Sequence, residues 1–226
     1  MTTIVAIQLD GAAVAATDSR LTEYFAETWA EYSTLAASNP KLASNGKYIF
    51  GAAGDLRAIN LLHHAFNPPA CPPNLKGRKL DQFMTVKFVP ALRACFEEHG
   101  YAIPDKDSKN HIAEHDSQIL CMINNTIYII DGDYSWYTNS TGMYAIGSGA
   151  AYALGALSAN APSARLTVLT AKKAATKALS IAARFDPATG GPFSAYIQES
   201  PREQQPVQTT PRAKKKTKPG RAKKKA

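Results

Sequence analysis

A threonine stands at the second position of the chain, in MTTIVAIQLDG, directly before a run of apolar residues. Removal of Met1 in the cell would give Thr2 a free α-amine beside its own hydroxyl. The ordinary pKa of an α-amine is about 7.7 to 8.0, so nearby positive charge can leave the amine largely neutral near pH 7. A threonine whose own amine is the base is an established kind of activated nucleophile. Thr2 is therefore a candidate catalytic residue, although its simplest interpretation is a β-branched residue that begins a strand.

Such a nucleophile needs a carboxylate and a cation to order it, and a backbone N–H to receive the oxyanion. Asp18 ends the second predicted strand, and a hairpin of the first two strands would return it to the terminus. Lys41 precedes the third strand, and Lys47 is the competing cation. Gly51 lies inside that third strand, where a glycine often marks the close approach of backbone or ligand. The chain thus offers each part of such a site.

Periodicity predicts the elements that must position these residues. Predicted strands are 3–8, 12–18, 47–54, 118–124, 125–131, 143–149 and an edge strand at 193–198. Predicted helices are 56–65, with Asp55 as N-cap, then 80–98, 150–159 and 166–185. The predicted order is strands followed by two helices, and this order occurs twice along the chain. It predicts an α+β fold in which the helices cover separate faces of the sheets.

The 226 residues fit one domain at 1–200 followed by a tail at 201–226. The tail carries 10 of the 26 Lys and Arg residues and one of the 18 acids, so the domain has 16 basic and 17 acidic residues. Because the tail has almost no apolar residues, it is predicted to be disordered. Its cations could bind the phosphates of nucleic acid in a salt-sensitive way. A solubilising or partner-docking role fits the tail equally well.

Several classes of site are not indicated. The three cysteines are scattered, and no apolar run approaches the roughly 18 to 20 residues of a membrane span. No signal peptide is recognisable. We therefore expect a cytoplasmic protein that has no membrane association and needs no metal or other cofactor. His111 and His115 have the spacing of a metal pair, but their polar surroundings favour a solvated loop.

Taken together, the motifs resemble a known family. TTIVAIQLDG, ATDSRLT, a lysine upstream of NGKYIFGAAGDLRA, and YAIGSGAAYALGAL are similar in type and order to the β-type subunits of the proteasome. The bacterial HslV peptidase is the most similar form, and the resemblance covers nearly all of 2–198. It implies the four-layer αββα sandwich of N-terminal-nucleophile (Ntn) hydrolases. It also implies a peptide substrate, a homo-oligomeric ring and an unfolding ATPase as partner.

The resemblance implies roles for the residues already singled out. Thr2 corresponds to the nucleophile whose amine is the general base, while Asp18 and Lys41 correspond to the charged pair beside it. Lys41 is assigned across a segment that is longer than in the family. Gly51 corresponds to the residue whose N–H binds the oxyanion. Thr3, by contrast, is predicted only to be part of the strand.

The resemblance adds five further positions. Ser148, in GSG, matches the serine that supports the terminal amine, and Asp186 with Thr189 resembles an Asp-x-x-Ser pair. Arg20 and Thr22 match positions that line the substrate cleft. These residues complete a predicted threonine-type peptidase site.

Two other functions remain open from the sequence. One is a non-catalytic shell protein with this fold that binds nucleic acid through its basic tail. The other is an Ntn amidase that acts on a small molecule, because the shape of a cleft is not readable from the residues.

Overall fold

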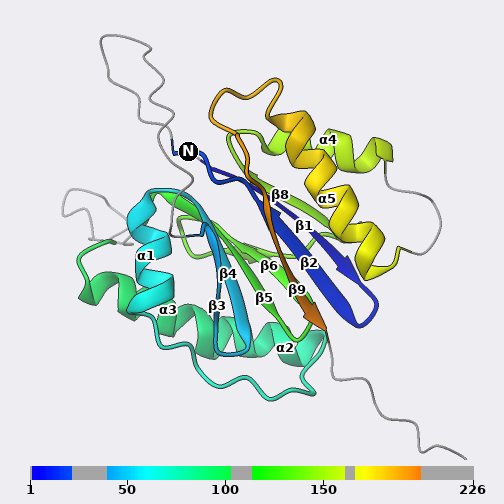
Figure 1. Ribbon diagram of the computed structural model, residues 1–226. Helices are drawn as coiled ribbons and strands as arrows, with labels where there is room; N and C mark the ends of the chain where they lie inside the picture. The colour runs from blue at the N-terminus through cyan, green and yellow to red at the C-terminus, as the bar shows by residue number, and fades with distance from the viewer. Residues whose placement is uncertain (1, 22–39, 103–113, 161–165, 200–226) are drawn as a thin grey trace, which may run out of the picture.

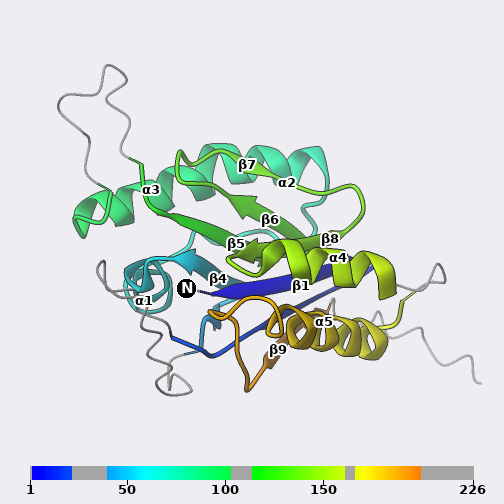
Figure 2. The same cartoon turned by 90° about the horizontal axis from the view of Figure 1, so that it is seen from above.

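The protein is described here from a computed structural model, which describes residues 2–21, 40–102, 114–160 and 166–199. Two antiparallel sheets lie face to face, and helices cover the outer face of each (Figures 1 and 2). The described part is thus a four-layer αββα sandwich, as the sequence predicts. The predicted disordered tail and most of the segment between Asp18 and Lys41 lie outside the described residues.

The first sheet contains both ends of the domain. Its strands are β1 (Thr3–Leu9), β2 (Ala12–Thr17), β8 (Met143–Gly147) and β9 (Ser194–Glu199). Their order is β8-β1-β2-β9, so the last strand is an edge strand, as predicted. The helices on this sheet are α4 (Ala150–Asn160) and α5 (Val168–Ala182).

The second sheet is built from the middle of the chain. Its strands are β3 (Leu42–Asn45), β4 (Tyr48–Gly54), β5 (Ser117–Ile123), β6 (Thr126–Ile130) and β7 (Trp136–Tyr137), in that order. Its helices are α1 (Leu56–His64), α2 (Arg78–Phe83), a π-helical turn (Met84–Phe88) and α3 (Val89–Glu98).

Three apolar cores separate the four layers. Along β1, side chains alternate between two of them: Ile4 and Ala6 face the core between the sheets, while Val5 and Ile7 face α4 and α5. This alternation follows from the two-residue period of a strand. Residues before Ile4 continue the same alternation, so Thr2 falls on the side between the sheets and Thr3 on the helix side.

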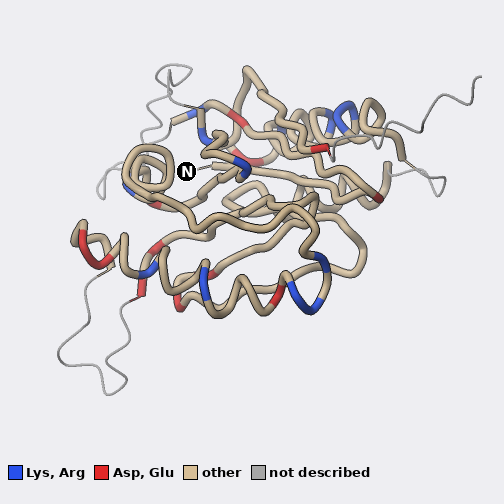
Figure 3. Tube along the Cα trace, turned by 90° about the horizontal axis from the view of Figure 1, so that it is seen from below, with Lys and Arg blue, Asp and Glu red and all other residues tan. Residues whose placement is uncertain are grey.

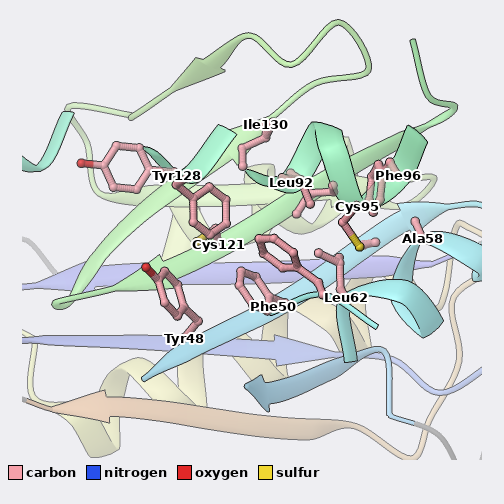
Figure 4. Packing of buried hydrophobic residues seen from close by; sticks show 14 of the residues in the cluster. Tyr48, Phe50, Ala58, Leu62, Leu92, Cys95, Phe96, Cys121, Tyr128 and Ile130 are labelled. Carbon is pink, nitrogen blue, oxygen red and sulfur yellow. The ribbon is translucent and has the colours of Figure 1, made fainter. Parts of the chain in front are cut away.

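The third core lies between the second sheet and its helices, and it is rich in aromatic residues (Figure 4). The ring of Phe50, on β4, lies 5.4 Å from that of Tyr48 and 5.9 Å from that of Phe88. Large rings bury much apolar surface, so this core fixes β4 against the helices. β4 is thereby a rigid support for the glycines near its end.

Local sequence signals account for several element ends. Asp55 caps α1 by accepting a hydrogen bond from the Arg57 N–H at 2.8 Å, as predicted. Asn124 and Asn125 form the two-residue turn between β5 and β6, with φ of 50° and 63°. The predicted helix 80–98 is divided by the π-helical turn, which directly precedes the helix that contains Pro90. A proline has no N–H for the preceding turn, and a widened turn accommodates this loss.

Charged residues lie mainly on the helices and loops, and the central strands carry few of them (Figure 3). Among the described residues, no helix has the length and apolar character needed to cross a membrane.

Candidate active site

Within the described residues, three of the Asp, Glu, Lys and Arg side chains are buried: Asp18, Lys41 and Asp186. Each lies close to the start of β1, although they are far apart in the sequence. Burying a charge is costly unless it is paired and hydrogen-bonded. The concentration of all three at one end of β1 therefore makes this end of the strand a candidate functional site.

The first part of the site joins β1, β2 and β3. β1 and β2 pair with Ile4 opposite Thr17, so Asp18 follows directly opposite Thr3, whose C=O accepts from the Asp18 N–H at 3.2 Å. Asp18 Oδ1 accepts a hydrogen bond from the Thr3 N–H at 3.0 Å and another from Lys41 Nζ at 2.9 Å. One carboxylate oxygen thus holds the ammonium group beside the peptide bond that follows Thr2.

Burial and pairing act in opposite directions on Lys41. Desolvation lowers the pKa of the Lys41 ammonium, and the charge and hydrogen bond of Asp18 oppose this change. Lys47, the competing cation, is exposed in the turn between β3 and β4, at the other end of the hairpin. The structure therefore brings Lys41, and not Lys47, to the candidate nucleophile.

The second part of the site lies at the start of α4 and in the loop before β9. The Ser148 N–H donates to the carbonyl of Thr2 at 3.1 Å, and Ser148 Oγ donates to Asp186 Oδ2 at 2.8 Å. Thr189 Oγ1 donates to the same Asp186 oxygen at 2.5 Å. The structure thus brings Ser148, Asp186 and Thr189 together next to Thr2.

Two glycines allow this close packing. A Cβ at Gly147, whose φ is +94°, would overlap the carbonyl oxygen of Thr2. A Cβ at Gly149 would lie 2.6 Å from the hydroxyl oxygens of both Thr3 and Thr189. The GSG motif is therefore explained by the approach of β1 and the 186–190 loop to the start of α4.

Gly51 is not brought to the oxyanion position. It pairs with Leu42 and with Leu120, so β3 and β5 flank it, and its N–H belongs to the sheet ladder. A Cβ at Gly51 would meet the side chains of Ile4 and Leu42 in the core between the sheets. Packing against the facing sheet, and not an open N–H, explains this glycine.

Gly54, at the end of β4, is an alternative candidate for the N–H that receives an oxyanion. The turn at residues 46–47 sets the alternation of β4, which directs the N–H of every second residue from Tyr48 to Gly54 toward the β3 side. β3 begins at Leu42, opposite Gly51, so among the described residues no strand residue pairs with Gly54 on that side. Its φ of +131° and the nearby carbonyl of Asp116 leave no room for a side chain. No motif in the sequence distinguishes Gly54 from Gly51 as this candidate.

Arg20 supports the same cluster through its backbone and side chain. Its N–H donates to Asp18 Oδ2 at 3.1 Å, its carbonyl accepts from Lys41 Nζ at 2.5 Å, and its Nη1 donates to the Pro187 carbonyl at 2.6 Å. Arg20 therefore ties the segment after β2 to the 186–190 loop. Thr22, the other residue expected in the cleft, lies outside the described residues.

Of the two histidines considered as a metal pair, His111 lies outside the described residues. His115 is not in a solvated loop, since it is 5 % exposed and packs among the rings of Phe96, Tyr101 and Tyr134. In the parts of the chain that the structure describes, no three His, Cys, Asp or Glu residues are grouped as metal ligands.

Comparison with known proteins gives structural matches. No family model and no curated protein matches the sequence. A structure of Thiobacillus denitrificans BPH in complex with epoxomicin is 24 % identical, with a TM-score of 0.66 over 88 % of this chain and 100 % of that chain. A second BPH structure from this organism is 24 % identical, with a TM-score of 0.65 over 88 % and 98 % of the two chains.

A third match is the eukaryotic HslV from Trypanosoma brucei, at 21 % identity and a TM-score of 0.57, over 88 % of this chain and 100 % of that chain. These matches, together with the two facing antiparallel sheets and their outer helices, settle the architecture. The chain has the Ntn-hydrolase fold of the HslV-like and BPH structures.

Proposed function

We propose that this protein is a threonine-type Ntn peptidase in which Thr2 is the nucleophile once Met1 has been removed. The observation that carries the proposal is the position of Thr2. It is buried at the start of β1, and its carbonyl and the following N–H are held by Ser148 and Asp18. Lys41 lies against the same Asp18 oxygen. A strand start with no chemical task would not need three buried charges around it.

The proposed reaction uses only groups of the chain and water. Thr2 Oγ1 attacks the carbonyl carbon of a peptide bond, and its proton passes to the α-amine of the same residue. The tetrahedral oxyanion collapses, the C–N bond breaks, and the ammonium returns the proton to the departing amine. Water then attacks the resulting ester, again with the amine as base, and releases the acid and free Thr2.

The surrounding groups assist these steps in different ways. The positive charge of Lys41 lowers the proton affinity of the amine, and Asp18 orients Lys41. Ser148 donates its proton to Asp186, so the lone pairs on its Oγ can accept a hydrogen bond from the amine. For the oxyanion we propose the N–H of Gly54 in place of that of Gly51, since no described strand residue pairs with Gly54 on the β3 side.

The structural matches support a peptidase at the level of the fold. One of the BPH structures holds epoxomicin, and we propose that the site described here binds the same compound. Assembly into a homo-oligomeric ring, an unfolding ATPase as partner and a cytoplasmic location extend the proposal further. Nucleic-acid binding by residues 201–226 is a separate proposal that rests on their charge.

The mass of the intact protein and its inhibition by epoxomicin test the proposed function. We expect a purified chain that is lighter by one methionine residue and a peptidase activity that epoxomicin abolishes. A chain that retains Met1 has an amide nitrogen in place of the amine, and this result would rule out the mechanism. Turnover of small amides without turnover of any peptide would indicate the amidase instead.

A further inference from the structure

Thr3 carries a wholly buried hydroxyl on a strand face that is otherwise apolar. Its side chain is 0 % exposed and lies on the same side of β1 as Val5 and Ile7, which face α4 and α5. A buried hydroxyl costs free energy unless it is hydrogen-bonded. A valine would fill this position without that cost, so the hydroxyl of Thr3 requires an explanation.

Only one assignment of donor and acceptor roles is consistent with the hydrogen bonds of this hydroxyl. Thr189 Oγ1 uses its proton on Asp186 Oδ2, at 2.5 Å, so it has none left for Thr3. A hydroxyl has one proton and two acceptor lone pairs. In the 2.6 Å contact between the two threonine oxygens, Thr3 must therefore be the donor.

Thr3 Oγ1 is in turn an acceptor. The Gly149 N–H donates to it at 3.0 Å. The hydrogen bonds thus run in one direction, from Gly149 through Thr3 and Thr189 to Asp186. Bonds aligned in this way polarise one another, so each is stronger than it would be alone.

This chain of hydrogen bonds ends on the carboxylate that Ser148 also contacts. Asp186 Oδ2 accepts from both Thr189 and Ser148, at 2.5 and 2.8 Å. The two donors fix the carboxylate and disperse its negative charge. Because Ser148 uses its proton on Asp186, the lone pairs of its Oγ remain available as acceptors. The backbone of Thr3 meanwhile contacts Asp18, so the residue links the two acidic centres of the site.

We propose that the Thr3 hydroxyl is a positioning group for the nucleophile and acts through Thr189 and Asp186. This inference rests on the proposed function. Thr3 touches no reacting atom. Its hydroxyl holds the carboxylate in the arrangement that leaves Ser148 ready to accept a hydrogen bond from the α-amine of Thr2.

The test compares Thr3→Val, which keeps the shape and the β-branch, with Thr3→Ser, which keeps the hydroxyl. Both variants retain the backbone contacts to Asp18. We expect Thr3→Val to lower kcat about tenfold, the effect of losing one hydrogen bond of ordinary strength, with little change in KM. Thr3→Ser should retain most of the activity. A Thr3→Val/Thr189→Val double variant should be little worse than Thr189→Val, because both changes break the same chain of hydrogen bonds.

A second readout measures the amine directly. The rate at which acetic anhydride acylates the Thr2 amine, followed against pH by mass spectrometry, gives the pKa of the amine without any need for turnover. In Thr3→Val the charge of Asp186 is less dispersed, so this pKa should rise and the acidic limb of the kcat profile should move to higher pH.

The outcomes separate the two proposals. An unchanged kcat and an unchanged amine pKa in Thr3→Val would overturn the role of Thr3, as would a Thr3→Ser variant as impaired as Thr3→Val. Peptide hydrolysis absent from the wild-type protein would overturn the proposed function. Even without peptide hydrolysis, the pKa of the Thr2 amine in Thr3→Val, compared with wild type, would decide whether the Thr3 hydroxyl influences that amine.

Discussion

Lys41 Nζ and Asp18 Oδ1 lie 2.9 Å apart, and both side chains are at most 2 % exposed. Their contact is what connects the segment before β3 with the start of β1, because Asp18 Oδ1 also accepts the Thr3 N–H. A buried ion pair is weak evidence for added stability, since desolvation offsets its attraction. Its position beside Thr2 is instead the one that the proposed mechanism requires of a cation and its carboxylate.

Replacing Lys41 by methionine should abolish most of the peptidase activity. The change removes the charge that lowers the proton affinity of the amine, and we expect kcat to fall by about 10² to 10⁴. It also leaves Asp18 buried without its cation, at a cost of about 3 to 5 kcal/mol in the free energy of unfolding. Kinetics and chemical denaturation measure the two effects. Lys47→Met is the matched control, because Lys47 is exposed in a turn, and it should behave as wild type.

Gly149→Ala should lower the peptidase activity, whereas the control Gly155→Ala should not. The new methyl carbon would lie 2.6 Å from the hydroxyl oxygens of Thr3 and Thr189, so the chain of hydrogen bonds must move. We expect at least a tenfold loss in kcat/KM, by the same reasoning as for the loss of one hydrogen bond. At Gly155, in α4, a Cβ meets nothing within 4 Å. Gly155→Ala should retain activity and raise the free energy of unfolding by roughly 0.5 to 1 kcal/mol.

His115 should make the protein less stable in mild acid. Burial among three aromatic rings lowers its pKa, although Asp116, Asp131 and Asp133 act in the opposite direction. The folded state then binds fewer protons than the unfolded state as the pH falls below about 6.5, the ordinary pKa of histidine. Stability should fall from that pH until the lowered native pKa is reached.

His115→Phe tests this prediction by denaturant titration between pH 7 and pH 5. The variant should lose less stability over this range than wild type, a difference of at most about 1.4 kcal/mol per pH unit for one group. His63, whose pKa burial also lowers, should account for part of the remaining dependence. The exposed His64→Gln is the control. Equal slopes for His115→Phe and wild type would contradict the assignment to His115.

Deletion of residues 201–226 should remove the proposed nucleic-acid binding and leave the proposed peptidase activity. The deletion removes ten cations and one acid, so binding to single-stranded nucleic acid, measured by fluorescence anisotropy at increasing salt, should disappear. Peptide hydrolysis should be unchanged. If the truncated chain still binds nucleic acid with the same salt dependence, the tail is not the binding segment.

The fold could be predicted where the sequence carries its own period or cap. The apolar run that forms β1 and the cap at Asp55 both act over a few residues, and both predictions are confirmed. β3 and β7 were not predicted. β3 has the sequence LASN and β7 has two residues, so pairing with a neighbouring strand, and not their own pattern, defines both.

Within the candidate site, the sequence indicates which side chains are present better than it indicates where each backbone N–H points. Asp18, Lys41 and Ser148 could be singled out as candidates because charge or a motif marks them, and the structure places them near Thr2. The choice between Gly51 and Gly54 depends on which N–H the neighbouring strand leaves uncovered, and that requires the register of β3 with β4. The hydroxyl of Thr3 looked like ordinary strand, because Thr189, its partner, is 186 residues away in the sequence.

The decisive measurement is the rate of peptide hydrolysis by Thr2→Ala beside that of wild type, in preparations whose masses show that Met1 is absent from both. If Thr2 is the nucleophile, Thr2→Ala shows no hydrolysis above background while its thermal stability is unchanged, and Thr2→Ser shows measurable hydrolysis. Hydrolysis at the wild-type rate by Thr2→Ala would contradict the assignment of Thr2 as the nucleophile.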